Sequence, residues 1–167
     1  MALEQLQDYG LEEMDEVSIH EFLRSQSTGV LGLPTKNAPY MLPMSYAYDG
    51  DSSLYFTYLL GESSRKETLS DLAERARFLV YNVETMFNWQ SVILTGDLEE
   101  VPQEEWPDLE DVLTNAWQPE LFQTAGASGR IKVYKLSIRS QTGIRHTGLA
   151  LGFQEGIEEP DEATEST

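Results

Sequence analysis

Hydrophobic residues alternate with polar or small ones through most of the chain, and a period of two is typical of β-strands. Short turns such as KNA and DGDS join neighbouring stretches, so we expect antiparallel hairpins. The pattern predicts six strands, at residues 28–35, 39–49, 53–60, 76–84, 89–101 and 130–140. With few helices, this is a mainly β (α+β) chain, and it favours a closed or nearly closed antiparallel barrel.

The first helix is predicted just ahead of these strands. Ser18 and Glu21 stand three residues apart and predict a capping box, with Val17 and Phe22 as a hydrophobic staple around it. We expect this helix to end near Ser25.

Another helix is predicted near Asp108 to Trp117, where apolar residues fall at i, i+3, i+4, i+7 and i+8. Gln118-Pro119 ends it, and its apolar stripe is assigned to the core or to a subunit interface. The last 14 residues, 154–167, hold six acids and no base. We therefore expect a single domain over residues 1–153 and a disordered acidic tail behind it.

The chain carries 29 acidic against 11 basic residues, a formal net charge of −18. This charge repels partners that carry phosphates, so neither nucleic acid nor an anionic membrane surface is expected as a partner. At roughly 1 M ionic strength the Debye length falls to about 3 Å, and the repulsion between the acids is screened. The composition favours a protein of a salt-rich cytoplasm, with an ordinary acidic mesophilic protein as the alternative.

The sequence contains no cysteine, and its two histidines are His20 and His146. Disulfides, thiolate nucleophiles and cysteine-ligated metals are thereby excluded, and no metal site is predicted. The N-terminus is acidic where a secretory signal carries cations, and no apolar run approaches about 18 residues. We expect a cytoplasmic protein without a membrane segment.

The strand at residues 39–49 has one large and one small face. The large face carries Tyr40, Leu42, Met44, Tyr46 and Tyr48. The opposite face is mostly small and carries Met41, Pro43, Ser45 and Ala47. Small side chains allow either a ligand or a packed helix to lie close to the backbone, and both interpretations stay open.

Two of the few cations are adjacent at the start of a predicted helix. Ser64 opens an S-x-x-E capping box, which makes Arg65 and Lys66 the first two helical residues. The helix macrodipole already places about half a positive charge there, so two cations are unfavourable unless an anion joins them. Phosphate fits, because free amides, serine hydroxyls and both cations converge on it. The alternative is that the cations pair with Asp71 and Glu62 on an acidic surface.

Three motifs follow one another in a specific order. They are the aromatic-Thr pair Phe56-Thr57, the turn Ser64-Arg65-Lys66, and Trp89-Gln90-Ser91 leading into the segment VILTG. In order and spacing, the stretch from Phe22 to Val101 resembles the pyridoxamine 5′-phosphate oxidase-like, FMN-binding split-barrel superfamily, with weaker support at residues 130–140. The resemblance implies a six-stranded antiparallel split β-barrel with short flanking helices.

The same resemblance implies FMN as the cofactor, with Arg65 and Lys66 on its phosphate. It also implies a homodimer in which both subunits line each flavin. The implied cofactor-binding residues are Pro43, Met44, Ser45, Tyr46, Phe56, Thr57, Ser64, Arg65, Lys66, Trp89, Gln90 and Ser91.

The chain also departs from the family pattern. Oxidases that act on pyridoxamine phosphate carry Arg and Lys along the strand that is 41–46 here, and a C-terminal substrate-binding segment with Arg, His and Trp. Here that strand is uncharged and the chain ends in an acidic tail, so oxidation of vitamin B6 is not expected. The loop between Thr57 and Arg65 is also longer than in those oxidases.

We therefore expect a small FMN-dependent oxidoreductase with a small-molecule redox substrate. The alternative is a non-catalytic flavin- or haem-type binding or sensing module in the same barrel. Catalytic residues stay unassigned, with Tyr46, Tyr58 and His146 as candidate proton donors. A homodimer is expected because strands 53–60 and 89–101 carry aromatic residues on both faces. In the competing account the helix near Asp108 covers the second face within a monomer.

Overall fold

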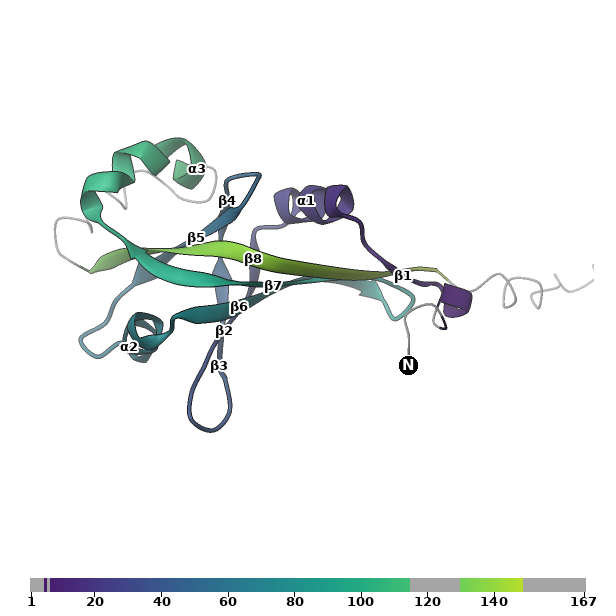
Figure 1. The fold of residues 1–167 in the computed structure, drawn as a ribbon, viewed down its shortest axis with the longest axis horizontal. Coiled ribbons are helices and arrows are strands. Elements are labelled where there is room, and N and C mark those ends of the chain that lie inside the picture. The colour runs from purple at the N-terminus through teal and green to yellow at the C-terminus, as the bar shows by residue number, and fades with distance from the viewer. Residues whose placement is uncertain (1–4, 6, 115–129, 149–167) are drawn as a thin grey trace, which may run out of the picture.

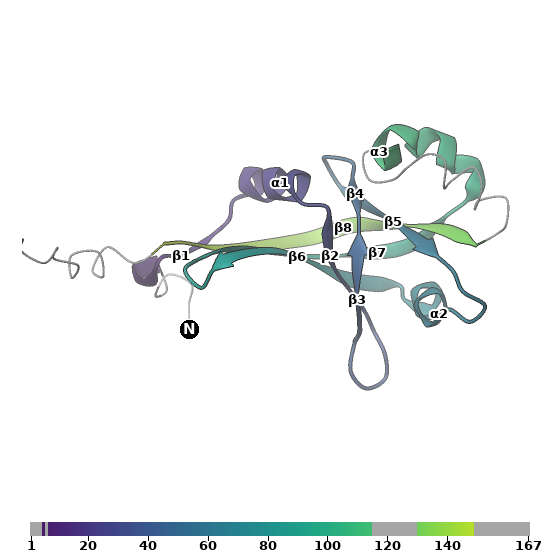
Figure 2. The same cartoon turned by 180° about the vertical axis from the view of Figure 1, so that it is seen from behind.

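The computed structural model describes residues 5, 7–114 and 130–148. In this part the chain forms one strongly curled antiparallel sheet with helices along its flanks (Figures 1 and 2). The expected acidic tail, residues 154–167, lies outside the described residues, as does the end of the helix expected to reach Trp117.

The helices are α1 (Glu16–Ser25), α2 (Arg65–Leu72) and α3 (Glu110–Thr114), and the 3-10 turns are η2 (Gln7–Tyr9) and η3 (Gln103–Leu109). The strands are β1 (Leu11–Glu13), β2 (Thr28–Leu33), β3 (Tyr40–Ser45), β4 (Ala47–Tyr48), β5 (Ser53–Leu59), β6 (Arg75–Thr85), β7 (Asn88–Val101) and β8 (Ile131–Thr147).

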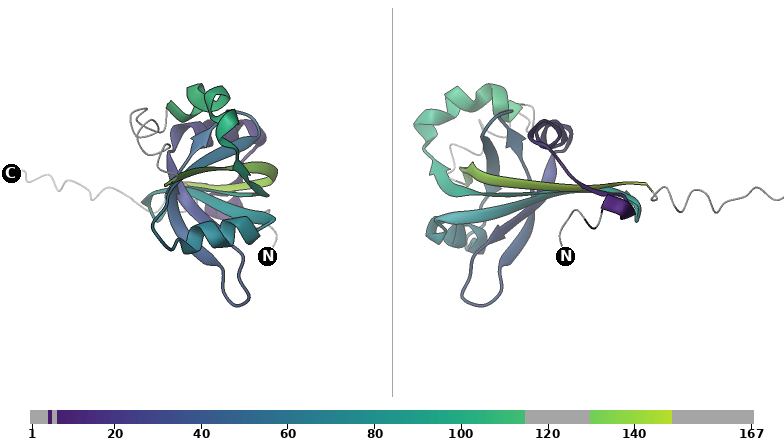
Figure 3. Two further views of the ribbon diagram at one scale, coloured as in Figure 1. Left: turned by 90° about the vertical axis from the view of Figure 1, so that its left-hand side faces the viewer. Right: turned by 45° about the vertical axis from the view of Figure 1, so that its right-hand side comes forward.

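One continuous segment of chain joins the two ends of the sheet. The strand order is β3-β2-β6-β7-β8-β5-β4, and β1 pairs with β8 off this path. β3 pairs with β2, and after the single residue Tyr46 the chain continues as β4, which pairs with β5. The end-on view shows the strands curled around a central core (Figure 3). The predicted split barrel is confirmed.

The expected number of six strands is wrong, because the described residues alone form a sheet of eight. The predicted strand 39–49 is divided into two at Tyr46. Before this residue the strand pairs with β2, and after it the strand pairs with β5. β1 is the other addition, and its sequence Leu-Glu-Glu is too short and too acidic to show alternation.

β6, β7 and β8 continue past the barrel as a long arm (Figure 1). β8 ends at Thr147 rather than near residue 140, and its last part pairs with β7 on one side and β1 on the other. The sequence of this part, QTGIRHT, is too polar to read as a strand. Pairing on both sides, rather than side-chain pattern, keeps it extended.

α1 begins earlier than expected. Its N-cap is Asp15, whose carboxylate accepts a hydrogen bond from the Ser18 amide at 2.8 Å. The capping box at Ser18 and the staple at Val17 are therefore wrong, and Val17 is 66% exposed. An Asp three residues ahead of Ser18 competes for the same role, and as a charged acceptor at a helix N-terminus it is favoured.

The barrel interior and one outer surface form separate apolar clusters. The inward residues of the strands pack with Ile19, Phe22 and Leu23 of α1 in the main core. On the outside of β4 and β5, η3 and α3 cover Ala47 and Tyr55. A helix thus covers the second face of β5 within one chain, as the monomer account expected for that strand. The same helix accounts for the small face of the 39–49 strand only at Ala47.

Candidate functional site

The first turn of α2 has the predicted geometry. Ser64 is the N-cap, and its hydroxyl accepts a hydrogen bond from the amide three residues on at 3.4 Å. The guanidinium carbon of Arg65 lies 4.9 Å from the centre of the Tyr40 ring. The Lys66 Nζ lies 5.5 Å from the centre of the Tyr58 ring. The two cations therefore rest on aromatic rings of β3 and β5.

Arg65 and Lys66 have no acidic partner in the described ranges. Among the described residues, no carboxylate forms an ion pair with Arg65 or Lys66. Glu67 instead bonds to a lysine of β8 at 2.9 Å, and Asp71 accepts a hydrogen bond from a β8 tyrosine at 2.7 Å. The alternative in which Asp71 and Glu62 neutralise the two cations is not what the structure shows in this region. Because the helix dipole opposes them, the unpaired cations favour a bound anion.

Beneath Lys66 lies a buried pair of tyrosines that the sequence did not reveal as a pair. The rings of Tyr58 and Tyr134 are 4.4 Å apart. The Tyr58 hydroxyl lies 2.7 Å from the Ser70 hydroxyl, and Tyr134 donates to Asp71. Burial raises the pKa of Tyr58 to about 12, so its phenol stays neutral. The Tyr58 phenol therefore adds no negative charge beneath Lys66.

β3 and β5 meet where the barrel is not closed by hydrogen bonds, and this seam is called the β3 gap. The two strands contact one another, but they are not hydrogen-bonded neighbours in the sheet. On β3, Pro43 and Ser45 are exposed and Met44 is half-buried, as the alternation predicts. Arg65 stands at the Tyr40 end of this strand. Pro43 and Ser45 thus lie on the face of β3 opposite to Tyr40, and β3 itself is an edge strand of the sheet.

Two of the expected site residues have side chains in the core. Phe56 is 0% exposed and packs with its ring 4.9 Å from that of Phe78. Tyr46 is 4% exposed, and its hydroxyl donates to the Leu23 carbonyl at 2.7 Å. Thr57 is also buried, on the opposite face of β5. The rings of Phe56 and Tyr46 therefore belong to the core and do not face a ligand outside the barrel.

The remaining expected residues, Trp89, Gln90 and Ser91, lie at the far end of β7. Gln90 is opposite Arg145 on β8, whereas Thr57 is opposite Val133 on the same strand. Twelve residues of β8 separate these two positions, which is roughly 40 Å along the strand. Within one chain Thr57 and the β7 group therefore lie far apart along the sheet, whereas Pro43 is in register with Ile93, two residues after Ser91, through Val30 and Leu79.

The three candidate proton donors are all engaged in hydrogen bonds. Tyr46 and Tyr58 bond to Leu23 and Ser70 as described, and burial raises the pKa of the Tyr46 phenol well above its usual range. His146 is 8% exposed, and its Nδ1 lies 2.6 Å from the Phe87 carbonyl oxygen at the end of the arm. None of these three residues is therefore assigned as the proton donor.

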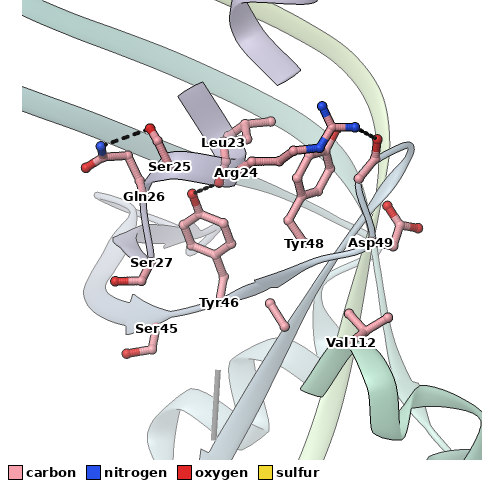
Figure 4. A pocket seen from close by; sticks show the side chains of 12 residues that line it. Leu23, Arg24, Ser25, Gln26, Ser27, Ser45, Tyr46, Tyr48, Asp49 and Val112 are labelled. Carbon is pink, nitrogen blue, oxygen red and sulfur yellow. Dashed lines mark hydrogen bonds between the residues drawn. The ribbon is translucent and has the colours of Figure 1, made fainter. Parts of the chain in front are cut away.

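A cavity of about 720 Å³ opens where β3 passes into β4 (Figure 4). Its walls come from the end of α1, the β3–β4 junction, the turn at Asp49-Gly50 and Val112 of α3. Sequence reasoning missed this cavity. Its cation, Arg24, stands in the last turn of α1, where a positive charge is ordinarily favoured by the helix dipole. No pattern in the sequence distinguishes it from a stabilising surface residue.

Two further properties concern only the described ranges, residues 5, 7–114 and 130–148. In them no three His, Cys, Asp or Glu side chains gather in a way that could hold a metal ion. Nor does any helix there have the length and apolar character needed to cross a membrane.

Solved structures with the same fold come from several bacteria. An FAD-binding protein from Mesorhizobium loti superposes with a TM-score of 0.66 and 18% identity, over 82% of this chain and 97% of that one. The FAD and heme binding protein from Mycobacterium smegmatis gives 0.64 and 15%, over 84% and 75%. An FAD binding protein from the same organism gives 0.56 and 13%, over 82% and 99%. At these identities the likeness shows the fold.

No curated protein sequence matches the chain. The sequence model of the family described as pyridoxamine 5′-phosphate oxidase matches residues 15–145. This range includes α1, the whole barrel and most of the arm, and hence all the expected site residues. The chain belongs to the pyridoxamine 5′-phosphate oxidase family.

Proposed function

We propose that this protein is an FMN-dependent oxidoreductase that works as a homodimer. The observation that carries the proposal is the pair Arg65 and Lys66, unpaired with any described carboxylate at a helix N-terminus of a chain with net charge −18. The phosphate of FMN is the anion that completes this turn, held by the cations, the free amides and Ser64.

The free edge of β3 suits the rest of the cofactor. From Tyr40 beside Arg65 to Ser45 is five residues, or roughly 17 Å of strand. Pro43 and Ser45 project small side chains from the face opposite to Tyr40, so a ligand that starts at Arg65 can reach them by lying along the free edge of β3. Bound there, FMN supplies the redox chemistry at its ring, and the protein supplies position and electrostatics. In this arrangement Pro43, Met44 and Ser45 flank the ring.

A second copy of the chain supplies residues that lie far from Thr57 within one copy. Trp89, Gln90 and Ser91 are roughly 40 Å of strand away from Thr57 in their own chain. A two-fold arrangement that crosses the arms brings the β7 group of one subunit to the β3 gap of the other. Each flavin is then lined by both subunits, with one chain's Arg65 and Lys66 at the phosphate.

The charge distribution supports this assembly. Residues 28–33, 40–45, 75–83, 88–96 and 138–147 of the sheet contain no Asp or Glu, although the chain has 29 acids. The outer face of these strands also exposes large apolar side chains: Tyr81 is 51% exposed, Val83 59% and Ile93 45%. An acid-free, partly apolar sheet face is where two strongly negative copies can meet without repulsion.

The shared site can be tested by mixing damaged chains. We expect Arg65→Ala/Lys66→Ala and Gln90→Ala homodimers each to bind FMN weakly at both sites. When the two variants are unfolded and refolded together, half-occupied hybrids appear, because one site per hybrid is intact. If the refolded mixture binds no more FMN with high affinity than the two variants do separately, a site shared between subunits is refuted.

Vitamin B6 is not the proposed substrate. Residues Met41 to Tyr46 are uncharged, so this strand offers no cation for the phosphate of pyridoxamine phosphate. A distinct small-molecule redox substrate is proposed instead, with a nicotinamide, a deazaflavin or oxygen as the redox partner.

A non-catalytic role is the second candidate, and the descriptions of three similar solved structures support it. Two of them bear the description FAD binding protein, and a third is described as binding both FAD and heme. The same barrel here could store or sense a flavin or haem without turning over a substrate. FAD would need contacts for its adenylate beyond the phosphate turn of α2.

Titration with FMN, FAD and haem in molar KCl separates these roles. The proposal requires saturable FMN binding with flavin absorbance and, after a nicotinamide or deazaflavin donor is added, bleaching of that absorbance with repeated turnover. Tight binding of a flavin that no donor reduces would favour the storage or sensing role. A protein that takes up no flavin would contradict both.

A further inference from the structure

The cavity beside β3 and β4 carries one cation, and its surroundings leave that cation free for a ligand. Arg24 donates from Nη2 to the Gly50 carbonyl at 2.8 Å, and no described carboxylate forms an ion pair with it. A guanidinium has five N–H donors in a planar fork. A single bond to a neutral carbonyl fixes its position without neutralising its charge.

The acid on the cavity wall is already engaged by its own turn. Asp49 Oδ1 accepts hydrogen bonds from the amides of Asp51, Ser52 and Ser53, at 2.9, 3.0 and 3.1 Å. These three donors stabilise the carboxylate where it stands. Asp49 therefore closes the turn instead of pairing with Arg24.

Gly50 allows the Arg24 guanidinium to lie close to this turn. Its φ of +86° suits glycine, and a Cβ at this position would lie 3.3 Å from Nη2 of Arg24. The glycine thus supplies both the carbonyl that holds the guanidinium and the space for it. The remainder of the polar lining is neutral, namely Ser25, Gln26, Ser27 and Ser45. Figure 4 shows Arg24 and these side chains around the same opening.

The size and position of the cavity point to a small molecule. Its volume of about 720 Å³ is within the usual range for ligand sites. Tyr48 and Val112 add apolar wall to the polar groups. Ser45 and Tyr46 line the cavity and also end the β3 edge along which we place the flavin.

We infer that this cavity binds a small organic anion whose charged group pairs with Arg24, and that the substrate of the flavin chemistry is of this class. The second clause rests on the proposed function, and the first does not. In a chain of net charge −18, an exposed guanidinium on the cavity wall without a described ion-pair partner selects for a carboxylate over a neutral compound of the same shape. Arg24 is in this sense a specificity-determining residue.

Benzoate and the neutral, similarly shaped benzamide are the probes. NMR spectra of the protein without flavin, at a KCl concentration that keeps it folded, follow the backbone amides of Ser27, Ser45 and Gly50. We expect benzoate to shift these signals saturably, with benzamide at least about tenfold weaker. Arg24→Gln should weaken benzoate by about tenfold or more, and Arg24→Lys by less. Lys36→Gln, which removes an equal charge from the β2–β3 loop, should leave it unchanged.

Equal affinity for benzoate and benzamide, equal benzoate binding by wild type and Arg24→Gln, or no saturable shift at all would each overturn the inference. Should Arg24→Gln fail to fold, the benzoate-to-benzamide ratio in wild type and in Arg24→Lys decides it. FMN affinity is measured separately in the same variants. Benzoate binding without FMN binding defeats the proposed function alone, and FMN binding without benzoate binding defeats only the Arg24 site.

Discussion

Removing Arg65 and Lys66 together should abolish tight FMN binding without unfolding the barrel. Charged hydrogen bonds to phosphate contribute about 1.5–3 kcal/mol each, so the double change to Ala should cost about 3–6 kcal/mol, or roughly 10²- to 10⁴-fold in Kd. Arg65 is more exposed than Lys66, and its single substitution should lie at the lower end of that range because solvent screens it.

The free energy of unfolding should hardly change in the same variant. The contacts with Tyr40 and Tyr58 are worth about 0.5–1 kcal/mol each at exposed sites. Their loss is offset because two cations no longer oppose the α2 dipole, an effect of about 0.3–1 kcal/mol each. Neither substitution removes an ion pair with a described residue.

Flavin fluorescence titration and urea unfolding of wild type and variant, at one fixed KCl concentration, measure both quantities. Lys36→Ala is the matched control, since Lys36 is an exposed cation in the turn between β2 and β3, outside the sheet face assigned to the dimer. It should bind FMN as wild type does. Unchanged FMN affinity in the double variant, with the control also unchanged, would refute the phosphate assignment.

The remaining predictions concern stability. Lowering KCl should lower the Tm or release FMN, because the excess of 29 acids over 11 bases is self-repelling when the Debye length grows to about 10 Å at 0.1 M. A Tm that is flat from about 0.1 M upward would make the salt-rich interpretation wrong. Gly96→Ala should destabilise by about 1–3 kcal/mol or more, because its Cβ would lie 2.2 Å from the Ser137 oxygen at the β7–β8 irregularity. Gly32→Ala, whose Cβ would meet its nearest atom at 3.6 Å, is the control, and equal losses in urea unfolding would refute the reasoning. Burial raises the pKa of Tyr58 from 10.0 to about 12 in the folded state, so its stabilisation is present below about pH 10 and is lost as the pH rises toward 12. Tyr58→Phe should therefore lose less stability over that interval than wild type, and an equal loss would contradict the assignment.

Local patterns were sufficient for the barrel and for the start of α2. Alternation in residues 40–45 and the N-cap at Ser64 are properties of neighbouring residues, and the structure has both, although Glu67 pairs with Lys132 instead of completing the box. The break at Tyr46 was not predictable in this way. It arises because the pairing partner changes from β2 to β5, which depends on strands far along the chain.

The arm and the cavity show the same limit. The strand through Gln141 to Thr147 has no hydrophobic period, and only its neighbours on both sides make it a strand. Arg24 becomes notable only when the turn at Gly50 folds back onto the end of α1. The distance between Thr57 and the β7 group also follows from strand length and register, which the motifs alone do not contain.

Light scattering combined with flavin absorbance in molar KCl tests the central claim most directly, because the claim joins FMN binding to a site built from two chains. The account predicts a particle of about twice 18.9 kDa that holds one FMN per chain. It also predicts that dilution into monomers releases the flavin. A particle near 18.9 kDa with FMN still bound would contradict the shared site, and a dimer that takes up no FMN would contradict the proposed function.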